Sequence, residues 1–199
     1  MRSVRYCVAM SVDGFIAGPH GEYDWIAPDP SFDFAALWNR FDTLLMGRRT
    51  FEVALARFEM VEKMSKRVVV VSTTLDPANH PGVTVIRNSV VEAIAALKAQ
   101  PGKDIWLMGG GVLFRNLLDA GLVDTVELTV IPVLLGSGVP LLPEGRRCAL
   151  QLKGQKSYPN STLSLVYSVV PQPQGAARKA RLSKPGAVKR PSQKKRRKP

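Results

Sequence analysis

Three short segments of the chain place glycine, arginine or hydroxyl residues directly after an apolar run. GRRT follows TLLM at 47–50, STT follows VVVV at 72–74, and three glycines follow IWLM at 109–111. Where parallel strands end, the next helix presents free N–H groups that favour anions, and glycine lets the backbone approach a pyrophosphate closely. The sequence therefore predicts that these segments bind a phosphate-bearing ligand.

The arginine pair indicates which dinucleotide would bind. The GxGxxG fingerprint of the Rossmann fold is absent, and no acidic residue lies about twenty positions beyond a glycine loop in the right context. The planar guanidinium groups of Arg48 and Arg49 suit a phosphate monoester better than a ribose diol. A charge-assisted hydrogen bond contributes about 1.5–3 kcal/mol, enough for roughly tenfold to hundredfold discrimination. These residues favour NADPH over NADH, and the missing fingerprint predicts that the dinucleotide binds differently from one in a Rossmann fold.

Each segment also has a purely structural explanation that requires no ligand. The glycines at 109–111 fit a tight turn with close helix packing, and the two arginines fit an exposed helix start with salt-bridge partners. Serine and threonine at the end of a strand more often form a turn than a ligand site. The occurrence of all three segments at predicted carboxyl ends of strands favours the binding site.

Apolar patterning predicts alternating strands and helices that would position these segments. SVVE at 89–92 has the form of a capping box, and Gly121 fits a helix C-cap. The predicted strands are 4–10, 43–46, 67–71, 83–86, 104–108, 125–133, 151–157 and 163–170, and the predicted helices lie at 34–41, from 50 onward, at 89–99 and at 112–120. This order predicts an α/β sheet with an antiparallel finish, in one domain at 1–171.

The positive charge is concentrated at the carboxyl end of the chain. Of the 28 basic residues, eleven lie in 172–199, which has no acidic residue; the first 171 residues hold 17 basic and 16 acidic ones. A segment rich in Pro, Gly, Ser, Lys and Arg cannot bury enough apolar surface to fold, so we predict a basic disordered tail at 172–199. It serves either as a solubilising terminus or for weak electrostatic contact with nucleic acid or an anionic membrane.

Other features limit the class of protein. Cys7 and Cys148 are far apart, in strand-like contexts and in no CxxC pattern, which predicts buried reduced thiols. His20 and His80 are too far apart in sequence to indicate a metal site, so we assign no metal. The first residues, MRSVRYCVAM, lack a long apolar segment and a small-residue cleavage site, and no run approaches eighteen apolar residues. These features predict a cytoplasmic protein.

Three longer stretches carry a resemblance to a known family. MSVDGFIAGPHGEYDW, LLMGRRTF and IWLMGGGVLFRNLLDAGLVDTVELTVIPVLLGSGVPLL resemble the dihydrofolate reductase-like superfamily, and more closely its branch with the C-terminal reductase domain of the riboflavin-biosynthesis protein RibD. The resemblance covers nearly all of 4–170. It implies a three-layer αβα fold around a mixed, mostly parallel sheet, with NADPH across the carboxyl edge of the strands. It also implies a homodimer.

The resemblance assigns roles to individual residues. The cofactor-binding residues it implies are Gly47, Arg48, Arg49 and Thr50 toward the 2′-phosphate and pyrophosphate, Ser72 and Thr73 on the adenosine side, Gly109, Gly110 and Gly111 toward the pyrophosphate and nicotinamide, and Ala9, Ile16 and Phe114 at the nicotinamide end. Phe114 stands where folate reductases often have a tyrosine, and Trp25 is placed at the wall of the substrate pocket. Asp33 is the nearest match to the catalytic carboxylate, with Asp29 and Asp13 as alternatives and a helix N-terminal acid as its structural explanation.

The expected function is an NADPH-dependent reductase that transfers hydride to a C=N or C=O bond of a small heteroaromatic molecule. The substrate is either a pyrimidine-ribose-phosphate of the riboflavin type or a pterin or folate. A phosphorylated ribose needs cations near the nicotinamide, and Arg40 and Arg115 are the obvious ones. The alternative is a catalytically inactive nucleotide-binding domain that the basic tail tethers to nucleic acid or an anionic surface.

Overall fold

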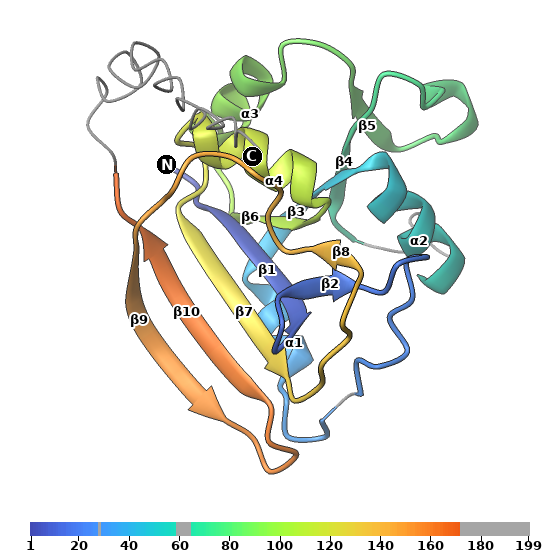
Figure 1. The fold of residues 1–199 in the computed structure, drawn as a ribbon. Helices are drawn as coiled ribbons and strands as arrows, with labels where there is room; N and C mark the ends of the chain where they lie inside the picture. The colour runs from blue at the N-terminus through green and yellow to red at the C-terminus, as the bar shows by residue number, and fades with distance from the viewer. Residues whose placement is uncertain (28, 59–64, 172–199) are drawn as a thin grey trace, which may run out of the picture.

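A twisted sheet of eight strands forms the centre of the molecule (Figure 1). The structure, a computed structural model, describes residues 1–27, 29–58 and 65–171; the predicted tail, 172–199, lies outside them. The strands are β1 (Val4–Ser11), β2 (Phe15–Ala17), β3 (Phe41–Gly47), β4 (Arg67–Val71), β5 (Val83–Ile86), β6 (Asp104–Gly109), β7 (Thr125–Ile131), β8 (Val139–Pro140), β9 (Leu150–Ser157) and β10 (Leu163–Val169). The helices are α1 (Phe34–Asn39), α2 (Arg48–Phe58), α3 (Val90–Ala99) and α4 (Gly111–Asp119), with a short 3-10 turn at Pro77–Asn79.

The strand order in the large sheet is β5-β4-β3-β6-β1-β7-β10-β9. The first six strands run parallel, and β10 is antiparallel to both of its neighbours. Strands β2 and β8 form a separate antiparallel pair. The mostly parallel sheet with an antiparallel finish confirms the predicted fold class.

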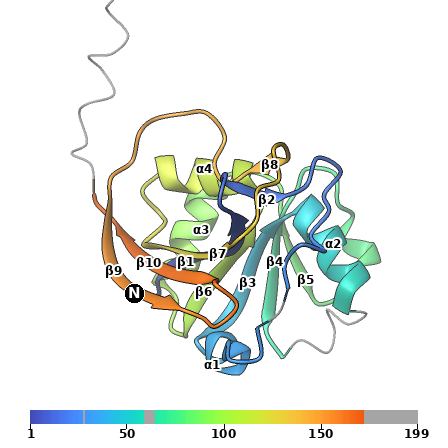
Figure 2. The same ribbon diagram turned by 60° about the horizontal axis from the view of Figure 1, so that its bottom comes forward.

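The sheet divides the core in two, and helices cover both of its faces (Figure 2). On one face, α3 and α4 pack against the sheet through apolar residues that include Ile94, Leu113 and Leu117. On the other, Phe51 of α2 and Trp38 of α1 pack against β3, β4 and β6. The buried central strands have apolar residues on both faces, as parallel strands between helix layers do.

Several local predictions need correction. Ser89 does not form a capping box, because its backbone is left-handed (φ 49°, ψ 45°) and its side chain makes no capping hydrogen bond. The first helix ends at Asn39, so that Phe41 begins β3. Cys7 is a buried free thiol on β1, whereas Cys148 is half-buried outside any strand. The Gly121 C-cap prediction is consistent with its φ of 70° and its N–H bond to the Leu118 carbonyl.

Candidate functional site

The carboxyl ends of three neighbouring strands bring the three predicted segments together. In the register of the sheet, Met46 on β3 is opposite Gly109 on β6, and Gly47 is opposite Val71 on β4. The chain leaves β3 directly into α2, and Ser72 follows β4 at once. The GRRT, STT and triple-glycine segments therefore lie at one edge of the sheet, as predicted.

Two of the three glycines are required by backbone geometry. Gly109 and Gly110 have φ values of 153° and 83°, which residues with a Cβ rarely adopt. A Cβ on Gly109 would also lie 3.3 Å from the Thr50 hydroxyl of α2. In α4, the first helical bond runs from the Phe114 N–H to the Gly110 carbonyl, so the N–H groups of the first turn have no helical acceptor. These donors are available at the same edge.

Gly111 serves helix packing instead. A Cβ on Gly111 would lie 3.0 Å from the Pro140 carbonyl oxygen and 3.1 Å from Cδ of Pro143. Gly111 is buried under the segment that follows β8. The structural explanation therefore holds for this glycine.

The two arginines of the GRRT segment differ in their partners. Both are exposed at the start of α2. Arg48 lies 3.3 Å from Glu52 one turn further along the helix, an exposed ion pair that contributes about 0–1 kcal/mol. Arg49 has no ion-pair partner within the described part of the chain, so its guanidinium group is the freer of the two.

The hydroxyls after β4 are not equivalent either. Ser72 is buried, and its Oγ accepts hydrogen bonds from the N–H groups of Thr74 (3.2 Å) and Leu75 (2.9 Å), which closes a turn. Thr73 is exposed at the edge. The Ser72 side chain thus shapes the loop, while Thr73 faces outward.

Ala9 and Ile16, two of the residues expected at the nicotinamide end, lie on β1, which is the neighbour of β6 in the sheet, and on β2, which contacts β1. Ala9 is half-buried near the end of β1, where its register partner is Thr129 on β7. Ile16 is half-buried on β2. Trp25 is half-buried in the following loop, where its indole N–H donates to the Glu22 carbonyl (3.1 Å).

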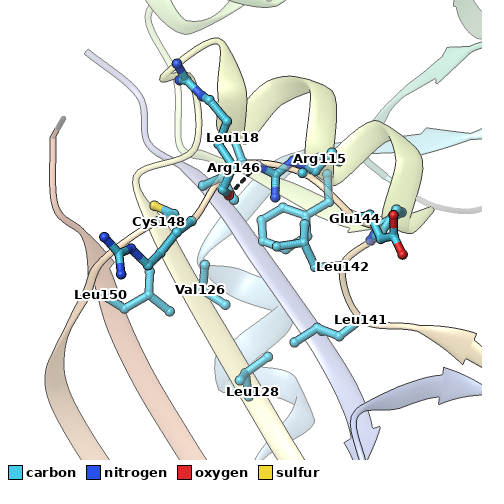
Figure 3. A pocket seen from close by; sticks show the side chains of 14 residues that line it. Arg115, Leu118, Val126, Leu128, Leu141, Leu142, Glu144, Arg146, Cys148 and Leu150 are labelled. Carbon is cyan, nitrogen blue, oxygen red and sulfur yellow. Dashed lines mark hydrogen bonds between the residues drawn. The ribbon is translucent and has the colours of Figure 1, made fainter. Parts of the chain in front are cut away.

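Phe114 follows the glycines in the first turn of α4, but its side chain is buried. It is 2% exposed in the α3/α4 core, and its ring stacks on Tyr6 at 3.8 Å. It also lines a cavity of about 420 Å³ between α4, β7 and the strap 141–150, shown in Figure 3. Leucines from β7, α4 and the strap form much of its wall, so this cavity is largely apolar and lies on the α3/α4 face of the sheet.

The three candidate carboxylates make different hydrogen bonds. Both oxygens of Asp13 accept from the loop at Leu135 and Gly136, and the Ser11 hydroxyl donates at 2.6 Å, which with those backbone bonds lowers the Asp13 pKa. Asp29 accepts from the hydroxyl and N–H of Ser31, and its pKa is lowered too. Asp33 is the exposed N-cap of α1, and one oxygen accepts from the Ala36 N–H at 2.8 Å.

A charge network was not predicted from the sequence. On the α1 side of the sheet, Arg40 donates to both carboxylate oxygens of Glu127, at 2.9 and 2.7 Å. Arg5 donates to Glu127 (3.1 Å) and to Asp104 (2.5 Å). Burial raises the pKa of Glu127, but the two guanidinium groups outweigh it and hold that pKa below its usual range. Glu127 is therefore ionised at neutral pH.

An aromatic cluster adjoins this network. Phe34 and Trp38 of α1 stack at 6.0 Å, and both rings approach Trp106 of β6, at 6.2 and 6.1 Å. The Trp106 indole N–H donates to the Cys7 carbonyl (2.9 Å). The helix spacing of 34, 37, 38 and 41 signalled α1, but the sequence did not indicate that its rings gather over β6.

No helix among the described residues has the length and apolar character needed to cross a membrane.

Comparison with known proteins agrees with this architecture. An uncharacterized Bacillus subtilis protein, YyaP, is 32% identical over 180 residues, 83% of this chain and 94% of its own length. The crystal structure of a putative riboflavin biosynthesis protein from Shewanella sp. PV-4 is 32% identical, with a TM-score of 0.73 over 86% of this chain and 100% of its own. Dihydrofolate reductase of Enterococcus faecalis, solved with NADP(H), is 21% identical with a TM-score of 0.62, over 84% and 96% of the two chains, and shows the shared fold.

These relatives and neighbours include reductases, and the family assignment is direct. A sequence model described as the RibD C-terminal domain matches residues 2–164, nearly all of the described chain. The chain belongs to the RibD C-terminal domain family, within the dihydrofolate reductase-like fold.

Proposed function

We propose that this protein is an NADPH-dependent reductase that transfers hydride to a C=N or C=O bond of a small heteroaromatic substrate. The observation that carries the proposal is the meeting of three segments at one sheet edge: the α2 start after β3, the turn after β4, and the glycines after β6. Membership of a reductase family supports the same reaction class.

The residues at this edge fit a phosphate-rich dinucleotide. A Cβ built on Gly47 would meet no atom within 4 Å, so the backbone there is open to a ligand. Arg49 has no ion-pair partner among the described residues and offers its guanidinium group for a 2′-phosphate, and the first turn of α4 offers N–H groups for a pyrophosphate. NADPH would supply the hydride when bound, and the protein would orient it and exclude water.

Asp33 is our candidate for the proton donor. Asp13 uses both carboxylate oxygens to bind the 135–136 loop, whereas Asp33 is an exposed residue that caps α1 through one oxygen. Its neighbour Phe34 lies against Trp106, which places Asp33 at the rim of the aromatic cluster. Ala9 and Ile16 would contact the nicotinamide end, and Trp25 would border the substrate.

Thermal-shift measurements with NADPH and NADH test the cofactor assignment. We expect NADPH to raise the melting temperature well above the value with NADH, because only NADPH carries a 2′-phosphate for Arg49. Arg49→Ala should remove most of that difference and Arg48→Ala a smaller part, since Arg48 already has Glu52. Arg67→Ala is the matched control, because Arg67 is exposed at the opposite end of β4 and should leave the difference intact.

Absence of stabilisation by either nucleotide would contradict the proposal. Stabilisation by NADPH without turnover of any heteroaromatic acceptor would instead favour the second candidate, a nucleotide-binding domain without catalysis that the basic segment 172–199 tethers to nucleic acid or an anionic surface. Eleven basic residues without an acidic one support that second candidate.

A further inference from the structure

The charge network lies on the same face of the sheet as the proposed nicotinamide end. On β7, Glu127 is the register partner of Cys7, and Thr129 is the partner of Ala9. Alternate residues of a strand share a face, so Glu127 and Thr129 point to one side, about 7 Å apart along the strand. Glu127 therefore lies two residues further from the carboxyl edge than the position assigned to the nicotinamide, and its network extends to Arg5 and Asp104 at the amino ends of β1 and β6.

The arginines on this face already have carboxylate partners. Glu127 is a bidentate partner of Arg40, the geometry that gives the strongest arginine–carboxylate pairs. Arg5 bridges Glu127 and Asp104. Two guanidinium groups thus face two carboxylates, and the cluster is neutral. The side chain of Glu127 is 9% exposed and that of Arg40 is 39% exposed, so a substrate would reach Arg40 first.

Arg115, the other cation that a phosphorylated substrate could use, is also engaged and on the wrong face. It donates to Asp119 at 3.0 and 2.6 Å and to the Arg146 carbonyl at 2.6 Å, beside the cavity under α4. Both arginines that could bind a ribose phosphate, Arg40 and Arg115, therefore already have carboxylate partners.

Next to the neutral network stands an apolar, flat surface. The Phe34 side chain belongs to the exposed part of α1, with the residue 51% exposed, and its ring lies within 24° of the Trp38 plane. Offset stacking on such rings stabilises planar ligands without any charge. The Lys66 ammonium lies 4.5 Å from the centroid of the Trp38 ring and donates to the backbone carbonyls of Trp38 and Phe41, so it is already engaged. The exposed Phe34 ring therefore offers an apolar stacking surface next to the network.

We propose that Glu127 sets the charge selectivity of this site: by holding Arg40 and Arg5 it leaves neither guanidinium group on this face free for a phosphate, so that the substrate is a flat heteroaromatic ring without a phosphate group. The inference rests on the proposed reductase function and narrows its substrate class. Glu127 is a positioning residue, because it acts through the two arginines and not on the substrate.

The first experiment releases the arginines. Glu127→Gln keeps the shape of the side chain and removes its charge, so Arg40 becomes free to bind a phosphate. With NADPH saturating the nucleotide edge, we expect calorimetric titration with ribose 5-phosphate to show at least a tenfold gain in affinity over wild type. Ribose itself should show no gain. Glu127→Asp retains the carboxylate and should behave as wild type, and adding Arg40→Met to Glu127→Gln should abolish the gain.

An unchanged affinity for ribose 5-phosphate in folded Glu127→Gln, checked by its melting temperature, would overturn the inference. Wild type provides a second test that needs no variant. We expect it to bind a ribitylated pyrimidine at least tenfold more tightly than the same compound with a terminal phosphate; equal or tighter binding of the phosphorylated form would also overturn it. Failure of NADPH to bind would count against the reductase proposal instead, and the same ribose 5-phosphate comparison would then be made without nucleotide.

Discussion

Asp33 caps a helix and is also proposed to donate a proton, and one substitution separates these two roles. Its carboxylate caps α1 through the Ala36 N–H, and it is our candidate proton donor. Asn caps helices about as well as Asp but cannot donate the proton. We therefore expect Asp33→Asn to lower turnover about a hundredfold or more, as loss of a general acid does, while the melting temperature changes by about 1 °C.

Steady-state oxidation of NADPH with the best heteroaromatic acceptor measures this effect. Asp33→Ala is the comparison variant, since it should lose the cap and the proton together and also melt lower. Unchanged turnover in Asp33→Asn would show that Asp33 is a cap alone.

At the scale of elements, we expect substitutions at two glycines of the sheet edge to have different effects, one on stability and one on nucleotide binding. Gly110 has a φ of 83°, so Gly110→Ala should lower the free energy of unfolding by about 1–2 kcal/mol, seen as a fall of several degrees in melting temperature. Gly47 ends β3 in an ordinary conformation with open space around it. Gly47→Ala should therefore fold as stably as wild type, yet place a methyl group where the pyrophosphate would lie.

We expect Gly47→Ala to weaken NADPH binding about tenfold or more by calorimetry with no loss of stability. Equal NADPH affinity in this variant would mean that the end of β3 does not contact the nucleotide. Only two of the three segments would then remain in the proposed binding site.

Elements were predictable from the sequence where they are long, buried and local. RVVVV and DIWLM gave β4 and β6 almost to the residue, because continuous apolar runs between turn residues have few alternatives. Strands β2 and β8 span three and two residues and pair only with each other across the fold, so no local pattern marks them. The Glu127–Arg40 pair joins residues 87 apart in sequence and depends on sheet register, which composition and spacing do not reveal.

At the scale of the whole molecule, charge is distributed unevenly along the chain. The first 171 residues hold 17 basic against 16 acidic residues, and all excess charge beyond that lies in 172–199. The structure contains a single chain, so the homodimer that the family resemblance implies stays a prediction. The tail makes a prediction of its own that is independent of the reductase site.

If the basic segment binds nucleic acid, affinity for a short single-stranded oligonucleotide should fall steeply with salt, with a log–log slope of about −0.7 per phosphate neutralised. A chain that ends at Pro171 should lose this affinity, because the remaining domain has almost no net charge. The same truncation should keep the NADPH-induced rise in melting temperature, since every residue assigned to the nucleotide edge lies before Pro171.

Fluorescence anisotropy across a salt series measures the affinity for the oligonucleotide. Oligonucleotide binding that survives truncation would place the contact on the folded domain, and wild-type protein that binds neither oligonucleotide nor anionic vesicles at low salt would leave the segment a solubilising terminus.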